Sequence, residues 1–368
     1  MLTLHVVQAA FGDSLLLEYG DPPHYLLIDG GPKDVYASAL RPKLAEIAAR
    51  GARLSGVVLT HSDDDHAVGL VDFFSDLWMQ QATGESPLIA VDTVWMNSFR
   101  FDAAAPSMQH ISLPVFPTNP SGDADEPLPL EGVEQALTLR GLVERMGIPL
   151  NPGFRGAVVA QDTAPATPPF AGLTIDLLGP TSARLKRLER EWDKWFASHP
   201  EAAAAPALPI PAAAVKPDSD GSIPNRASIM FLATVEGRRI LFTGDGRSKD
   251  VIAGLTHAGL MEKGGALHVD VLKVPHHGSA RNASPSFFRR VTADVYVFCA
   301  NGKDDNPDYV TLEWLVAALQ EQGRRARFVA TTRTPSLVQL EEHYPPTEWG
   351  YTLEVAGEGQ AAMPVRMA

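Results

Sequence analysis

The chain has 368 residues, of which 45% are hydrophobic and 20% are charged, proportions that are ordinary for a soluble globular protein. Its formal net charge of −13 excludes a broad basic surface of the kind that holds nucleic acid non-specifically through its phosphates. The single cysteine, Cys299, excludes an internal disulfide framework and a cysteine-based zinc site. This length is enough to bury a large core, and it fits either one large α/β domain or two smaller ones.

The sequence also carries expectations about location. The first residues show no basic segment followed by an apolar run and a small-residue cleavage site. No stretch approaches the ~18 consecutive apolar residues of a membrane span. We therefore expect a cytoplasmic protein that has no membrane partner.

The first part of the chain predicts strands and helices in alternation. Runs of β-branched and apolar residues indicate strands, and apolar residues at helical spacing indicate helices. In chain order these are three strands, a helix, a buried strand and a second helix, at residues 2–7, 15–19, 25–29, 40–50, 55–60 and 67–74. This order is the start of an αββα sandwich, a mixed α/β (α+β) fold in which two sheets face each other under outer helices.

The remainder continues this pattern with interruptions. Strands are predicted at 91–96, 173–178, 225–231 into 239–246, 267–274 and 295–299, and helices at 131–146, 182–198, 287–291 and 311–321. Residues 107–129 and 201–217 are rich in Pro and small residues and predict a loop or flap and a mobile connection. We interpret 181–224 as an insertion or lid, and the tail from Phe328 as strands and turns without evident chemistry. Trp192 and Trp195 lie at helical spacing, which favours a core role over a cover for the active site.

The densest chemical motif is the turn between the strand at 55–60 and the helix that follows it. His61, Asp63, Asp64, Asp65 and His66 all lie within six residues. Acidic residues are common at helix starts, but imidazole and carboxylate ligands together suit zinc and neighbouring metals. The turn therefore predicts a divalent metal site.

Further candidates follow later predicted strands. Asp245 ends the hairpin in Thr243-Gly244-Asp245-Gly246, and His276 and His277 follow the next strand in Pro275-His276-His277-Gly278-Ser279. Taken alone, Asp245 could be a turn residue and the two histidines a capped pair. Asp29, in Ile28-Asp29-Gly30-Gly31, could likewise be a plain turn residue.

Taken together, these motifs resemble the metallo-β-lactamase-fold hydrolase superfamily, whose signature is His-x-His-x-Asp-His. Asp63 stands here at the second His, and this variant is similar to the soluble domain of ComEC/Rec2-type competence proteins. The segments Gly12-Asp13-Ser14, Gly244-Asp245 and Pro275 to Ser279 also resemble that domain. The resemblance implies a single four-layer metallo-β-lactamase-like domain over residues 1–368, with 181–224 inserted into it.

The resemblance also implies roles for the candidate residues. His61 and Asp63 would bind one metal, Asp65 and His66 a second, and Asp245 would bridge both. One of His276 and His277 would complete the second site; we favour His276, which directly follows the strand, although the sequence leaves the choice open. Asp29 would orient the metal turn by hydrogen bonds, and Lys273, Ser279, Arg281 and Arg247 would supply positive charge or donors to the substrate.

Two departures from the family pattern stand out. Many relatives supply a further His between the first motif and Asp245, where this chain has only His110 and His199. The competence-type domain has His-Pro where this chain has Asn306-Pro307, and an amide cannot shuttle a proton at neutral pH. The carboxylate of Asp63 is also a harder ligand than imidazole. We therefore expect two divalent ions, zinc first, with manganese or magnesium as alternatives.

The first functional hypothesis is a phosphodiesterase or nuclease that uses a water between the two metals, with Asp65 or Asp245 accepting its proton. A hydrolase of a small phosphodiester, lactone or thioester is the second, favoured by the acidic composition and the lid-like insertion. A non-catalytic binding or regulatory module is the third, because of the departures at Asn306 and the missing His. Nucleic acid stays possible as a partner, and the sequence leaves the oligomeric state open.

Overall fold

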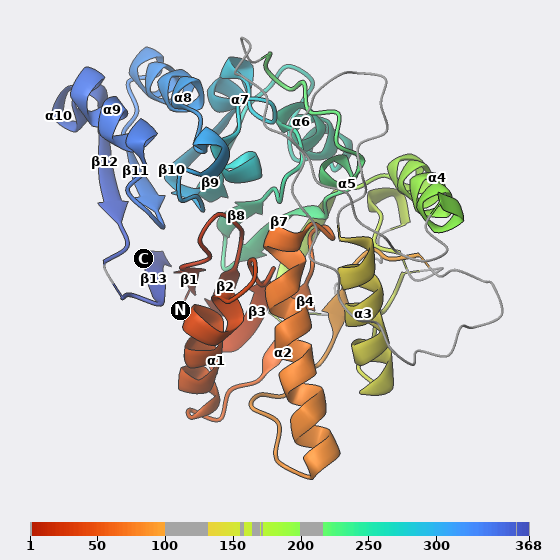
Figure 1. Ribbon diagram of the computed structural model, residues 1–368. Helices are drawn as coiled ribbons and strands as arrows, with labels where there is room; N and C mark the ends of the chain where they lie inside the picture. The colour runs from red at the N-terminus through yellow and green to blue at the C-terminus, as the bar shows by residue number, and fades with distance from the viewer. Residues whose placement is uncertain are drawn as a thin grey trace.

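The computed structural model describes residues 2–99, 132–154, 158–163, 170, 172–198, 216–357 and 359–367. Two mixed sheets face each other at its centre (Figure 1). The first has the order β13-β1-β2-β3-β4-β5, and its strands are β1 (Leu2–Val7), β2 (Leu15–Tyr19), β3 (His24–Ile28), β4 (Leu54–Val58), β5 (Val94–Trp95) and β13 (Ala362–Met367). The second has the order β12-β11-β10-β9-β8-β7-β6, and its strands are β6 (Thr174–Gly179), β7 (Met230–Val235), β8 (Arg238–Phe242), β9 (Leu267–Lys273), β10 (Val291–Phe298), β11 (Ala326–Ala330) and β12 (Tyr351–Val355).

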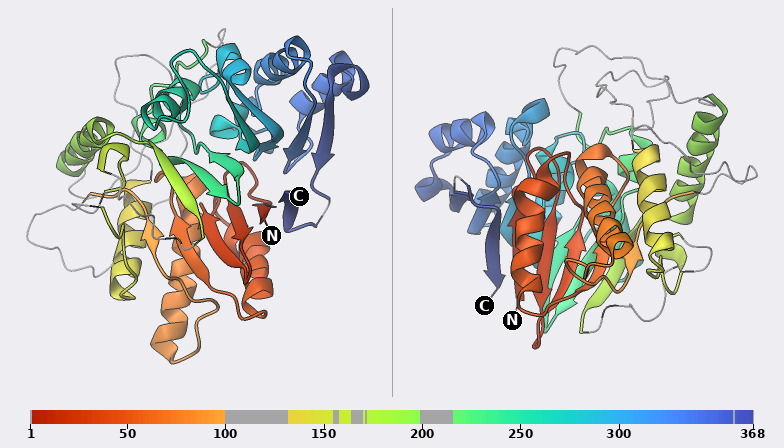
Figure 2. Two further views of the ribbon diagram at one scale, coloured as in Figure 1. Left: turned by 180° about the vertical axis from the view of Figure 1, so that it is seen from behind. Right: turned by 60° about the horizontal axis from the view of Figure 1, so that its bottom comes forward.

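Helices cover the outer face of each sheet, as the views in Figure 2 show. The first sheet is covered by η1 (Tyr36–Leu40, a π-helix), α1 (Arg41–Ala48), α2 (Asp64–Thr83), α3 (Val133–Arg145) and α4 (Ser182–Ser198). The second is covered by α6 (Ser248–His257), α7 (Pro285–Arg290), α8 (Tyr309–Glu321), α9 (Pro335–His343) and α10 (Pro346–Trp349). Short helices η2 (Gln161–Thr163), α5 (Ile223–Arg226), η3 (Pro275–Gly278) and η4 (Lys303–Asp305) lie in the connections.

Three apolar clusters correspond to the three interfaces between these four layers. Between the sheets, Leu17 and Ile28 of the first sheet pack in one cluster with Phe231 and Phe242 of the second. The outer clusters hold the apolar faces of the helices, as with Phe73 of α2. Burial of each large apolar side chain contributes about 1.5–3 kcal/mol, so alternate residues of each strand hold the layers together.

The fold class predicted from the sequence is confirmed: the structure is a mixed α/β sandwich in which two facing sheets are covered by outer helices. Two details differ. The strand predicted at 91–96 is only the two residues of β5, because continuous pairing with β4 is limited to them and Val91 adds only an isolated bridge to Leu54. The tail is also not limited to strands and turns, since it includes α9 and α10 and ends in β13, which returns to pair with β1.

Other predictions fall partly outside the described residues. The loop predicted at 107–129 lies there, as does most of the connection at 201–217, so the extent of the insertion at 181–224 stays a prediction. Its first helix, α4, is described, and Trp192 is buried in the cluster beneath it. The core role favoured for Trp192 is therefore confirmed. No helix in the described ranges has both the length and the apolar character needed to cross a membrane.

Candidate metal centre

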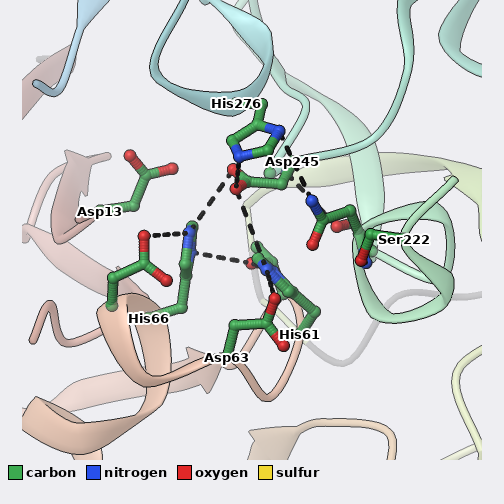
Figure 3. Close-up of polar contacts among 12 residues, drawn as sticks. Asp13, His61, Asp63, His66, Ser222, Asp245 and His276 are labelled. Carbon is green, nitrogen blue, oxygen red and sulfur yellow. Dashed lines mark hydrogen bonds and ion pairs between the residues drawn. The ribbon is translucent and has the colours of Figure 1, made fainter. Parts of the chain in front are cut away.

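The candidate residues lie where the parallel strands of both sheets end. Strands β3 and β4 run parallel in the first sheet, and β8, β9 and β10 run parallel in the second. Parallel strands bring their carboxyl ends to one edge of a sheet, the usual place for a site in such folds. Asp29, the 60–66 turn, Asp245 and the two histidines after β9 therefore meet, as Figure 3 shows for those it labels.

The turn after β4 is held by tight backbone packing against the turn after β3. The amide of Gly30 donates to the carbonyl of His66 over 2.8 Å, and the amide of Gly69 donates to Gly31 over 2.9 Å. A Cβ added to Gly69 would overlap the carbonyl oxygen of Gly30, so glycine is required for this close approach. The first turn of α2 is thereby fixed against the first sheet.

Asp29 orients His66 within this turn. Its side chain is fully buried and accepts hydrogen bonds from the amide and the hydroxyl of Thr60, both at 2.7 Å. The same carboxylate lies 2.8 Å from Nδ1 of His66. A proton on Nδ1 leaves the lone pair of Nε2 directed at the centre, which is the arrangement that metal-binding histidines adopt.

Asp245 is the centre of the cluster. Its Oδ1 lies 3.5 Å from Nε2 of His66, and its Oδ2 lies 3.4 Å from Nε2 of His277. The same Oδ2 is also 3.4 Å from Nε2 of His276 and 4.0 Å from Nε2 of His61. Both carboxylate oxygens of Asp245 thus face imidazole nitrogens, so this one side chain lies within reach of the ligands from both sheets.

His277 and His276 occupy different places in this arrangement. Nδ1 of His277 donates to the carbonyl of Cys299 over 2.8 Å, and its Nε2 lies 3.2 Å from Oδ2 of Asp65. His276 instead bonds Oδ1 of Asn282 through Nδ1, also at 2.8 Å. Asp65, His66, Asp245 and His277 together form a group with one ligand atom each within 4.8 Å of the others. The geometry therefore favours His277, and not the preferred His276, beside Asp65 and His66.

Both rings reach the centre through an unusual backbone. His276 and His277 have φ values of 45° and 55°, in the left-handed region that non-glycine residues seldom adopt. Asp308 donates its amide to the carbonyl of Gly278 over 3.2 Å, and Pro307 lies against the same glycine. Asn306-Pro307, the pair that differs from the family pattern, thus leads into the segment that packs behind the histidine turn.

Burial and neighbouring charges shift the pKa values of these groups strongly. Burial acts to lower the pKa of His66, but the carboxylates of Asp245, Asp65 and Asp29 outweigh it and raise that pKa well above its ordinary value. Burial acts to raise the pKa of Asp245, but His276, His277 and His66 hold that pKa well below its usual range. Without metal, the carboxylates and the imidazoles of His66, His276 and His277 thus favour each other's charged forms.

A buried cation lies behind Asp245. Nζ of Lys273 is 2.5 Å from Oδ2 of Asp13 and 3.7 Å from Oδ1 of Asp245, and its side chain is 1% exposed. Burial acts to lower the pKa of Lys273, but Asp13 and Asp245 raise it above its ordinary value. Lys273 therefore balances charge beneath the centre and does not reach a substrate, contrary to one of the roles expected for it.

The other expected donors are placed differently as well. Arg247 is buried and pairs with Asp250 at 2.8 Å, so its guanidinium is already committed. Ser279 is buried, with its hydroxyl near the amide of Arg281. Oδ1 of Asn306 is buried with no hydrogen-bond partner among the described residues. His110 and His199 lie outside the described residues.

The residues present fit divalent metal. Within the described chain, Nε2 of His61, His66 and His277 and Oδ1 of Asp245 are buried and have no hydrogen-bond partner. Buried polar atoms are rarely left in this state, and here they converge from four separate positions. Oδ2 of Asp63 lies 3.5 Å from Nε2 of His61. One ion would be held by His61, Asp63 and Asp245, and a second by Asp65, His66, Asp245 and His277.

Sequence reasoning missed the polar network that joins the second-sheet ligands. Asp220 accepts from the amides of Asn225 and Asn282 at 2.9 and 2.8 Å. Asn282 also donates to the carbonyl of Asp245 over 2.7 Å. Asp13 likewise lies in the motif Gly12-Asp13-Ser14, which gives no sign of its ion pair with Lys273. A buried Asp or Asn in a loop leaves no periodic signal, so only the fold reveals these contacts.

Comparison with known families agrees with this geometry. Residues 9–151 match the model of the metallo-beta-lactamase superfamily. This part of the chain carries β2 to β5 and the 61–66 motif, and the match supports the superfamily. A search of curated proteins found no match. The superfamily match and the convergent His/Asp cluster together suggest a metal-dependent hydrolase.

Proposed function

We propose that this protein is a binuclear metallo-hydrolase that cleaves phosphodiesters. The observation that carries the proposal is the convergence of unpartnered, buried Nε2 atoms from His61, His66 and His277 on Asp245. Two divalent ions, when bound, lower the pKa of a water and neutralise charge on the attacking and leaving oxygens. Zinc is the first candidate, with manganese or magnesium as alternatives because three of the donors are carboxylates.

The side chains of the centre divide into a buried set and a partly exposed set. Asp245, His66 and His277 form the buried set, with side chains at most 4% exposed. Asp65 and His276, at 23% and 26%, reach toward solvent. Asp65 is therefore the group best placed to accept the proton of an attacking water, whereas Asp245 holds the imidazoles in register.

We favour a phosphodiester over a neutral substrate because positively charged side chains lie near the site. A lactone or thioester gains nothing from nearby guanidinium groups, whereas a phosphate forms strong charge-assisted bonds with them. Asn225 contacts His276, and the next residue, Arg226, lines a pocket together with Arg184 and Arg187 of α4. The non-catalytic alternative gains no support from the centre, whose unpartnered donors within the described residues are suited to ions.

The test is hydrolysis of bis-p-nitrophenyl phosphate by the metal-loaded protein and by Asp245→Asn. Even partners of metal ligands change activity by about 10–100-fold when replaced, so we expect Asp245→Asn to lose more than about 100-fold in kcat/KM. Asp294→Asn, which removes an exposed carboxylate of β10, is the matched control and should keep wild-type turnover. No turnover by the wild type with zinc, manganese or magnesium would reject a phosphodiesterase.

A further inference from the structure

A pocket outside the metal centre opens between the start of α4 and α5. Its volume is about 350 Å³, enough for a small ligand. The two helices that form it lie side by side (Figure 1). In a chain with a net charge of −13, half of its lining residues are arginines: Thr181, Ala183, Arg184, Arg187, Ile223 and Arg226.

The positive charge of this pocket is incompletely balanced. Arg184 pairs with Asp250 at 2.6 Å, but the same carboxylate also pairs with Arg247 at 2.8 Å. Neither Arg187 nor Arg226 has an ion-pair partner in the described parts of the chain, and Nε of Arg226 is buried without a hydrogen bond there. A buried guanidinium donor normally has an acceptor, and an anion in this pocket would supply one.

Burial and neighbouring positive charge both act on the guanidinium of Arg226. Burial first, followed by the charges of Arg184, Arg247 and Arg187, lowers its pKa to about 10. Arginine is effectively always protonated, so a bound anion would offset both the desolvation and the repulsion. The helix start itself does not supply the site, because Asp162 already caps the amide of Ser182 at 2.8 Å.

The pocket is connected directly to the metal centre through α5. Nδ2 of Asn225 lies 3.5 Å from Nδ1 of His276, whose Nε2 faces Asp245. The next residue, Arg226, lines the pocket. The short helix α5 thus places Asn225 against His276 of the metal centre and Arg226 in the arginine pocket. This proximity is what two parts of one substrate site require.

We propose that the pocket of Arg184, Arg187 and Arg226 is a second phosphate subsite. It binds a phosphate group of the substrate other than the one that is cleaved. Planar guanidinium groups bind phosphate through paired, charge-assisted hydrogen bonds. The inference rests on the proposed phosphodiesterase activity and narrows it to substrates that carry at least two phosphates, either an oligonucleotide or a nucleotide with a diphosphate.

The test measures binding separately from turnover. The probes are a fluorescein-labelled five-nucleotide oligothymidylate with phosphorothioate linkages, followed by anisotropy, and a nucleoside diphosphate that competes with it. The variant is R187Q/R226Q in the full-length, metal-loaded protein. The matched control is Arg325→Gln, which removes an exposed arginine next to β11. Circular dichroism and thermal unfolding verify that each variant is folded.

We expect R187Q/R226Q to weaken binding about tenfold and Arg325→Gln to change it less than about twofold. Each lost contact to a single strand should also reduce the slope of log K against log salt by about 0.7. Loss with the oligothymidylate identifies a polymer, and loss with the diphosphate alone identifies a nucleotide. If both probes bind the variant and the wild type equally, the subsite is rejected.

Turnover of bis-p-nitrophenyl phosphate, which has one phosphate, keeps the two proposals apart. Arginine-dependent binding in a protein that hydrolyses no phosphodiester would retain the phosphate subsite and reject the proposed activity. If the protein hydrolyses bis-p-nitrophenyl phosphate but binds both probes equally well with and without Arg187 and Arg226, the proposed activity is retained and the phosphate subsite is rejected.

Discussion

The two halves of the sandwich present their ligands in different ways. The first sheet supplies His61, Asp63, Asp65 and His66 from one continuous turn, packed by glycines against the neighbouring turn. The second sheet supplies Asp245 and His277 from the ends of two separate strands. These ends are joined by side chains, since Asn282 bonds both the carbonyl of Asp245 and the ring of His276. The first half thus relies mainly on close backbone packing of adjacent residues, whereas the second adds a network of side chains from distant segments to the backbone bond between His276 and Gly244.

This difference has a consequence for perturbation. A change in the first half should act on the orientation of a single turn and so on metal affinity. A change in the network of the second half should act on the stability of the fold as well, because Asp220 and Asn282 link segments 62 residues apart in the chain. The predictions below use this contrast.

The largest expected effect is that of pH, which acts on both halves at once. Burial acts to lower the pKa values of His66 and His277, but neighbouring carboxylates raise both well above the ordinary value. Both rings are therefore protonated near neutral pH without metal, and each must lose a proton to bind it. Between about pH 7 and about pH 6, we expect affinity to fall up to about 100-fold, tenfold for each proton.

Competition with a chelating dye over this pH range measures the effect. An affinity that does not change with pH would show that the two rings are already neutral without metal.

Replacement of Asp29 tests the first half. Asp29→Asn keeps the shape of the side chain but weakens the bond that orients His66. We expect metal affinity to fall by about 10–100-fold, as for other partners of metal ligands. Asp72→Asn, a half-buried carboxylate farther along α2, should bind metal as the wild type does. Equal metal affinities of Asp29→Asn and Asp72→Asn would show that Asp29 does not contribute to metal binding.

Replacement of Asp220 tests the second half. Burial acts to raise the pKa of Asp220, but His276, Asn282 and the amide of Ser222 lower it to about 2. A lowered pKa contributes stability above the unfolded value of about 4, and this contribution is lost as the pH falls toward about 2. We expect Asp220→Asn to lose about 2 kcal/mol at neutral pH and to show a flatter decline in acid.

Urea denaturation of the metal-free protein at neutral and acid pH gives both quantities. Asp21→Asn, an exposed carboxylate between β2 and β3, is the control. A neutral-pH stability of Asp220→Asn within error of that control would mean that the network does not hold the second half together.

The parts of this structure that the sequence could predict follow the same division. The 61–66 motif was recognisable because its donors are adjacent in the chain, and the sandwich because strand and helix periods are local. The choice between His276 and His277 depended on which ring faces Asp65, which the left-handed backbone of both residues decides. Lys273 follows the strand pattern of a core position, but its partner Asp13 lies 260 residues earlier, so its buried role appears only in the fold.

The most direct test of the central claim is the metal content per chain, measured by elemental analysis after equilibration with zinc. The two ligand sets predict two ions in the wild type and one in each of His61→Ala and His277→Ala, since each variant removes a donor from a different set. A wild-type protein that binds one ion or none, or a His61→Ala variant that still binds two, would contradict a binuclear centre built from both halves.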